Sequence, residues 1–158
     1  MNKALSISKP APSPRQTPFW EQPLAALDRG QWEALCDGCG RCCLHKLEDE
    51  ETGVLHPTNV ACKLLDRRSG QCTDYGHRKK LVADCVTLDR KTLGTLDWLP
   101  DTCAYRLRAN GEPLREWHYL ISGDRESVHL AGQSTRGWTV SEVDAGDDLE
   151  FHVVERAL

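Results

Sequence analysis

The sequence lacks any long apolar run, and its hydrophobic content is low for a folded chain. No stretch of the 158 residues approaches the ~18 consecutive apolar residues that a transmembrane helix needs. Hydrophobic residues make up 39% of the chain, and the mean hydropathy is −0.53. A polar chain of this size builds a thin core. The composition therefore excludes a membrane span and predicts a second source of stability.

The amino-terminal residues also lack the features of a secretory signal. Such a signal needs an apolar segment of about 7–15 residues, whereas Ala4 and Leu5 are followed by Ser6, Ser8 and Lys9. We therefore expect a cytoplasmic protein, in which thiols stay reduced. In that compartment the eight cysteines indicate metal ligands, and a disulfide scaffold is the rival interpretation.

Basic charge is not in excess, and no common catalytic motif is present. The 20 Lys and Arg residues face 24 Asp and Glu residues, so the net charge is −4. This balance argues against nucleic acid as a partner, because a general phosphate-binding surface needs clustered basic side chains. The sequence contains no GxSxG, P-loop, GxGxxG or Ser-His-Asp order. It favours binding over catalysis, with a metal ion and a protein of unknown identity as partners.

The chain divides into three predicted parts. Residues 1–18 hold four of the eight prolines and form a predicted disordered tail, residues 19–140 form a Cys-cluster domain, and residues 141–158 form a carboxy-terminal extension. Apolar spacing predicts helices over 19–30 and 77–93, with an irregular segment over 44–75 between them. Segments 114–121, 138–143 and 149–154 are rich in β-formers, and 127–131 fits either strand or a helical turn. The expected class is α+β: a small, irregular, metal-stabilised domain, with helices and loops around a Cys cluster and short strands in the C-terminal half.

The motif Cys36-Asp37-Gly38-Cys39-Gly40-Arg41-Cys42-Cys43 carries the chemistry. It contains two overlapping CxxC units, whose two-residue spacing brings both sulfurs to one side of a tight turn. Gly38 and Gly40 allow positive φ angles, so that backbone N–H groups can point at the sulfurs and offset thiolate charge. The segment is therefore predicted to be a metal-binding loop.

The vicinal pair Cys42-Cys43 constrains the number of ions. Neighbouring side chains tend to diverge, so these two thiols are expected to bind two different ions or two atoms of one cluster. Eight thiols divide into two tetrahedral four-thiolate zinc sites. The overlapping CxxCxxC also resembles a ferredoxin run for a four-iron cluster, but lacks the fourth Cys and the Cys-Pro of that run. The predicted metal ligands are Cys36, Cys39, Cys42, Cys43, Cys62, Cys72, Cys85 and Cys103, binding zinc (two ions in the simplest count) or, alternatively, iron or an iron–sulfur cluster.

Other side chains near the cysteines are weaker candidates. Two four-thiolate sites would each carry a charge of about −2, which calls for positive neighbours, and we select Arg41 and Arg78 for this role. His45 and His77 lie close to cysteines in sequence but fit ordinary surface positions better than ligand positions. His118 and His129 are farther from the cluster and are not expected to bind metal.

The cysteine run and the residues after it resemble the bacterial YcgN-like family, within the CxxCxxCC group of zinc- or iron-chelating domains. The similarity continues through Ala61-Cys62, Asp84-Cys85-Val86, Trp98-Leu99-Pro100 and Thr102-Cys103-Ala104-Tyr105, and covers roughly residues 19–137. It departs at Ala83 and Tyr119, where relatives are expected to have Pro. The resemblance implies metal chelation in a bacterial cytosol. Larger proteins with a related cysteine domain are associated with an iron–sulfur cluster, which keeps iron open.

Three functions follow from these patterns. The first is a metal-binding protein with a structural, metal-handling or partner-binding role. The second is an iron–sulfur redox protein or an accessory factor to an enzyme. The third is a thiol-based redox sensor, in which cysteine oxidation would eject the metal.

Overall fold

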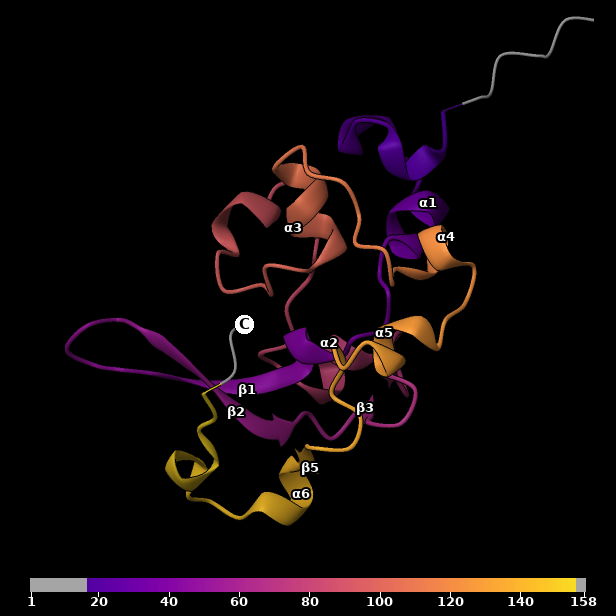
Figure 1. Ribbon diagram of the computed structural model, residues 1–158. Helices are drawn as coiled ribbons and strands as arrows, with labels where there is room; N and C mark the ends of the chain where they lie inside the picture. Colours follow the sequence, from indigo (N-terminus) through magenta and orange to yellow (C-terminus); the bar gives the residue numbers. More distant parts are fainter. Residues whose placement is uncertain (1–16, 156–158) are drawn as a thin grey trace, which may run out of the picture.

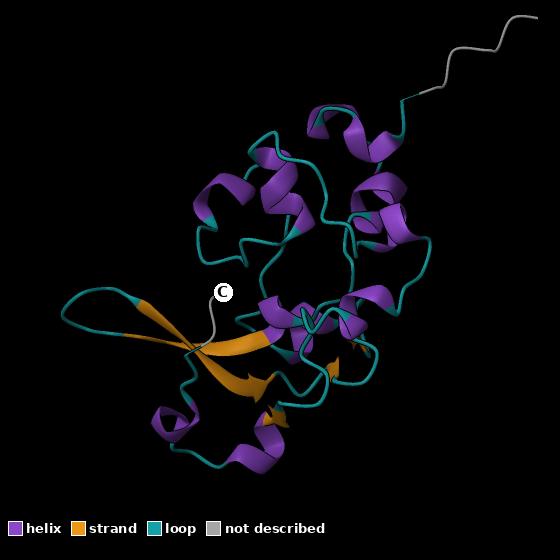
Figure 2. Cartoon of the chain, in the orientation of Figure 1, coloured by secondary structure: helices purple, strands orange, loops and turns teal. Residues whose placement is uncertain are grey.

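The computed structural model describes residues 17–155, which form the irregular α+β domain that the sequence predicts (Figures 1 and 2). The predicted tail, residues 1–18, lies almost wholly outside the described residues. The helices are short: α1 (Arg29–Ala34), α2 (Arg78–Leu81), α3 (Ala104–Ala109), α4 (Tyr119–Ser122), α5 (Ser127–Leu130) and α6 (Glu142–Ala145). Single 3₁₀ turns cover Phe19–Glu21, Leu24–Ala26, Arg41–Cys43, Leu93–Thr95 and Leu149–His152. Within residues 17–155, no helix has the length and apolar character to cross a bilayer.

A small mixed sheet organises the lower part of the molecule in Figure 1. Strand β1 (Leu44–Glu48) pairs antiparallel with β2 (Leu55–Ala61), and β5 (Val140–Ser141) adds a short parallel strand beside β2. A separate two-stranded ribbon joins β3 (Leu65–Asp66) to β4 (Gln71–Cys72). The expectation of strands in the C-terminal half is therefore wrong for all but β5. The segment 44–75, predicted to be irregular, contains the other four strands of the described residues.

Two apolar clusters of unequal size stabilise the fold. The larger contains the fully buried Leu35 and Leu99, together with Trp32 and Tyr105, and gathers around α1 and α3. Tyr105 donates a hydrogen bond from its hydroxyl to the Trp32 carbonyl at 2.9 Å, which ties α3 to α1. The smaller cluster contains only three buried residues, Leu44, Ala61 and Leu65, between the sheet and the β3–β4 ribbon.

The amino-terminal helix is interrupted, contrary to the prediction from Trp20, Leu24 and Leu27. Two 3₁₀ turns replace it, with Pro23 between them, because proline has no N–H to continue a helical ladder. Asp28 caps the start of α1: its side chain accepts the Gln31 N–H, while the Gln31 side chain accepts the Asp28 N–H. This reciprocal cap starts the helix before Gly30, the residue at which the earlier helix was predicted to end.

The other differences arise where tertiary contacts override local pattern. The helix predicted over 77–93 is limited to α2, because the chain becomes extended at Val82 and the segment with Cys85 turns toward other cysteines. The strand predicted over 114–121 is a loop followed by α4, which His118 caps by accepting the Leu120 N–H at 3.1 Å. In the segment 149–154 only Val153 forms a bridge, to Thr58.

Candidate metal centre

The cysteine loop leaves α1 and enters the sheet through the 3₁₀ turn Arg41–Cys43. Gly38 and Gly40 both have positive φ, 78° and 74°, as the motif predicts. A Cβ on Gly40 would lie 2.7 Å from the Thr135 hydroxyl oxygen, and the Thr135 N–H donates to the Cys39 carbonyl at 2.9 Å. The loop is therefore fixed by backbone conformation and by close packing, and both require glycine.

Four of the predicted ligands form one neighbourhood, here called group one: Cys36, Cys39, Cys42 and Cys103. Cys36 interacts electrostatically with Cys42 and Cys103, and Cys39 interacts with Cys36 and Cys42. Cys42 and Cys103 also pack against the larger apolar cluster. The loop thus gathers three thiols, and Cys103, at the start of α3, joins them from 61 residues beyond Cys42.

Backbone N–H groups point at the sulfurs of group one. The Gly38 N–H donates to Cys36, the Arg41 N–H to Cys39, and the Tyr105 and Arg106 N–H groups to Cys103. These donors stabilise the thiolate form, which is the form that binds metal. Gly38, Arg41 and Tyr105 each lie two residues after the cysteine that accepts their N–H. The same spacing occurs at Cys62, whose sulfur accepts the Leu64 N–H at 3.4 Å.

Without a cation, the group-one thiols hold their protons. Loss of hydration around the sulfur, together with the neighbouring Cys42, raises the pKa of Cys36 to about 12, although this residue lies at the solvent edge. Burial raises the pKa of Cys103 to about 11 and that of Cys39 well above its usual value. For Cys42, the hydrogen bond with Cys43 raises the pKa first, and burial adds to it. Metal binding at group one therefore requires the release of thiol protons.

The remaining thiols form a second neighbourhood, here called group two: Cys43, Cys62, Cys72 and Cys85. Cys62 interacts electrostatically with Cys72 and Cys85. Cys43 joins them through the backbone, because its carbonyl accepts the Cys62 N–H at 2.9 Å, and it packs against the smaller apolar cluster. Group two is thus built from the sheet, the β3–β4 ribbon and the segment after α2.

The two groups meet at the vicinal pair. The sulfurs of Cys42 and Cys43 are 4.0 Å apart, close to the ~3.8 Å edge of a tetrahedron with bonds of about 2.3 Å from zinc to sulfur. They nevertheless contact different apolar clusters, Cys42 the larger and Cys43 the smaller. A second contact joins the groups, since a Cβ on Gly70, in the β3–β4 turn, would lie only 1.7 Å from the Gly38 carbonyl oxygen.

Neither group is a closed coordination shell as it stands. Among residues 17–155, no set of three or more His, Cys, Asp or Glu side chains is arranged to hold a metal ion. The donor chemistry fits a soft cation, because every candidate ligand is a free thiol with other thiols nearby. An ion would therefore have to draw the sulfurs inward.

Two charged residues near the thiols were missed in the sequence. Asp37 accepts the Cys39 N–H at 3.0 Å and interacts with all four thiols of group one. Lys46 interacts electrostatically with Cys42 and favours its thiolate form. The proposed cations make other contacts: Arg41 donates to the Thr102 hydroxyl at 3.5 Å, and Arg78 stacks on Tyr75. Lys46 lies in β1, where the sequence gives no strand signal.

The histidines have partners other than the thiols. His45 pairs with Glu142 at 2.5 Å and His77 with Asp74 at 2.8 Å. His118 is buried, and because its Nδ1 accepts the Leu120 N–H, its Nε2–H donates to the Leu35 carbonyl at 2.9 Å. His129 bonds the Ser134 hydroxyl at 2.7 Å. Each of these contacts is structural.

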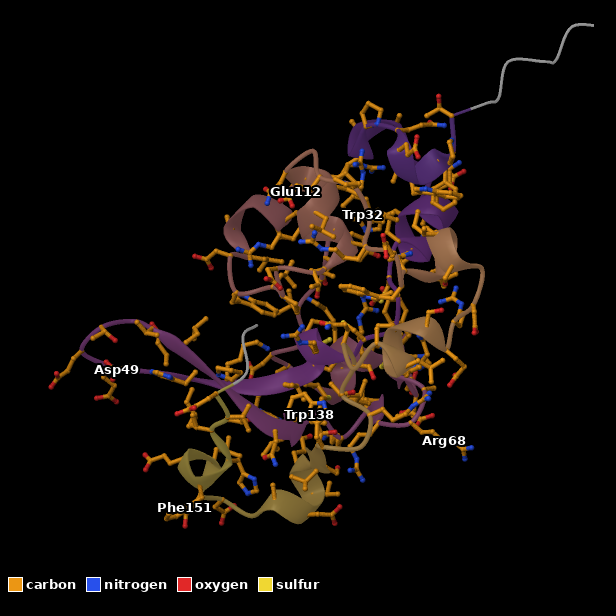
Figure 3. The ribbon with its side chains drawn as sticks, in the orientation of Figure 1. Trp32, Asp49, Arg68, Glu112, Trp138 and Phe151 are labelled. Carbon is orange, nitrogen blue, oxygen red and sulfur yellow. The ribbon has the colours of Figure 1, made fainter. Side chains whose placement is uncertain are left out.

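An open cleft of about 500 Å³ borders the cysteine loop, and the largely buried Asp37 lines it. Its walls carry three arginines, one of them Arg68, which Figure 3 shows pointing outward at the edge of the molecule. Three carboxylates balance them, including Glu126, which Arg136 holds at 2.6 Å. The charges of the walls cancel, so the cleft presents no net positive surface.

Comparison with known proteins gives the family. Residues 35–104 match the CxxCxxCC model described as "Putative zinc- or iron-chelating domain", and all eight cysteines lie within that segment. No solved structure matches the chain.

Close relatives extend the match over most of the chain. A UPF0260 protein of Rhizorhabdus wittichii is 63% identical over 142 residues, which cover 89% of this chain and 97% of the relative. A UPF0260 protein of Rhodobacter capsulatus is 55% identical over 139 residues, covering 87% of this chain and 93% of the relative. One from Agrobacterium fabrum is 51% identical over 140 residues, covering 87% and 86%. The chain therefore belongs to the UPF0260 family, and its CxxCxxCC domain supports the binding of a metal ion.

Proposed function

We propose that this protein binds two metal ions, one at each group of four thiols, and that zinc is the ion at both. The observation that carries the proposal is the division of eight free thiols into two groups at the vicinal pair Cys42-Cys43. Four thiolates around one ion form the usual closed shell of structural zinc. Such a shell leaves no open position for a substrate, so the ions would serve folding and the presentation of a surface to a protein partner.

The physical basis is a linkage between metal binding and folding. The larger apolar cluster has eight buried residues, whereas the cluster beside the sheet has only three. Zinc–thiolate bonds in small domains contribute about 10–16 kcal/mol of apparent binding free energy, which is folding free energy when the unfolded chain has no site. Two ions would compensate for the thin core that the composition predicts.

Iron is the competing ion, because three group-one thiols come from a CxxCxxC run. Elemental analysis and a visible spectrum of protein purified without oxygen separate the two. About two zinc ions per chain without colour supports the proposal. Iron with sulfide and a broad band near roughly 400 nm would replace it with an iron–sulfur protein.

Chelation tests the structural role. We expect a strong chelator to remove the far-ultraviolet circular dichroism of the sheet region and to lower the melting temperature. Full removal of metal without a change in the dichroism or the melting temperature would contradict a structural function.

A further inference from the structure

One lysine lies at the point where the two thiol groups meet. Lys46 belongs to β1 and is half-buried. Its ammonium donates a hydrogen bond to the Leu44 carbonyl at 2.7 Å and lies 4.4 Å from the centre of the Trp98 ring. These two contacts hold the charge in place beside the vicinal pair.

The charge acts on both members of that pair. Cys42, of group one, and Cys43, of group two, each interact electrostatically with Lys46. Lys46 is therefore shared between the groups and belongs to neither alone.

Two loaded groups would repel each other. A four-thiolate site with a divalent ion carries a charge of about −2, and the two sites would share adjacent residues. Asp37 adds a further negative charge on the group-one side. A partly buried pair is poorly screened by salt, so a fixed positive charge between the sites has a large effect on whether both can be filled.

We propose that Lys46 is the shared counter-charge that permits both thiol groups to hold metal at the same time. The inference rests on the proposed function, since it concerns the second ion rather than the first. With Lys46 the second ion binds almost as well as the first. Without it, the first ion binds and the second is opposed by the first.

Backbone contacts also link the two groups, in a way that makes metal binding at one group favour metal binding at the other. An ion at group one fixes Cys42, and hence the turn Arg41–Cys43 that positions Cys43. The Cys43 carbonyl in turn holds the Cys62 N–H at 2.9 Å. An ion at group one thus organises Cys43 and Cys62, two ligands of group two. The positive charge of Lys46 offsets the repulsion between the two negatively charged sites, which would otherwise cancel this favourable effect.

The test is a zinc titration of the whole metal-free chain, followed by native mass spectrometry and by competition with a chromophoric chelator. Lys46→Met keeps an apolar chain against Trp98 and removes the charge, while Lys46→Arg keeps the charge. Lys91→Met, at an exposed turn, is the matched control. We expect the wild type and Lys91→Met to pass directly to the two-ion form. Lys46→Met should accumulate the one-ion form, with the second dissociation constant raised about 10- to 100-fold, within the usual range of coupling between sites.

Three results would overturn the inference or its basis. A second dissociation constant in Lys46→Met within twofold of the wild type would refute it. The same loss in Lys46→Arg as in Lys46→Met would assign the effect to packing instead of charge. A wild-type chain that never binds a second ion would refute the proposed function itself, and the inference with it.

Discussion

The two thiol groups are built differently, although each contains four cysteines. Group one lies on a glycine-shaped loop beside the larger apolar cluster, and three of its sulfurs accept backbone N–H groups. Group two comes from four separate places: the 3₁₀ turn Arg41–Cys43, the end of β2, the two-residue strand β4 and the irregular segment after α2. It lies beside a cluster of three buried residues. In group two the Cys62 sulfur accepts the Leu64 N–H at 3.4 Å. The difference teaches that a thiol site can be prepared by the backbone before metal binds, or can depend on the metal to become ordered.

The largest effect is expected when one ligand is removed from either group. Cys39→Ser should lower the melting temperature more than Cys72→Ser, because a site that the backbone prepares in advance spends less binding free energy on ordering the chain and so binds its ion more tightly. Loss of a structural ion is expected to remove most of a total stability of about 5–15 kcal/mol. Differential scanning calorimetry of the metal-loaded variants gives the ranking, and an equal or reversed ranking would show that group one is not the better-built site.

Gly70→Ala should break the distinction by damaging both groups at once. The new Cβ would overlap the Gly38 carbonyl oxygen, and the residue has φ of 73°. Overpacking and backbone strain each cost about 1–3 kcal/mol, so we expect a loss of roughly 3 kcal/mol or more. Gly111→Ala is the matched control, since Gly111 has φ of 74° and open space around it. Denaturant unfolding should show a clearly smaller loss of unfolding free energy for the control. Equal losses would show that the close contact between Gly70 and the Gly38 carbonyl does not contribute to stability.

A smaller effect should appear on acidification through His118, on the group-one side. Burial lowers the pKa of His118 below its ordinary value. The unfolded chain therefore takes up the proton before the native one does, and stability falls as the pH drops from 7 toward 5. The free energy of unfolding of His118→Asn should vary less with pH over this range. A slope for His118→Asn that matches the wild-type slope would rule out this role.

The smallest expected effect is that of His129→Ala. Its ring bonds Ser134 beside the cleft, and no thiol contact involves it within the described residues. Elemental analysis should give the wild-type metal content for this variant. If metal were lost, a histidine would have to be added to the ligand set.

Local chemistry was readable from the sequence, whereas long-range placement was not. The positive φ angles of Gly38 and Gly40 follow from the motif. The adjacency of Cys42 and Cys43 predicts side chains that diverge, whereas their sulfurs lie 4.0 Å apart and share a hydrogen bond. Cys103 lies near the cysteine loop because α3 packs against α1, and no local sequence pattern predicts that packing. Strand β1 was missed because polar residues such as Lys46 occupy its half-buried positions.

Apolar periodicity predicted a helix wrongly where one of the periodic residues is a cysteine that lies near other cysteines. Leu81, Cys85 and Leu88 share a helical face in sequence, yet the helix ends at Leu81 and Cys85 turns toward Cys62. Similarly, the β-formers between Leu114 and Ile121 lie in a loop and in α4, because His118 is fixed by the Leu35 carbonyl.

The number of ions bound by three chains tests the central claim most directly. Native mass spectrometry at saturating zinc should give two ions for the wild type, one for Cys39→Ser and one for Cys62→Ser, because each variant loses one group and keeps the other. A single ion in the wild type, or the loss of all metal in both variants, would contradict two separate sites and indicate one shared centre.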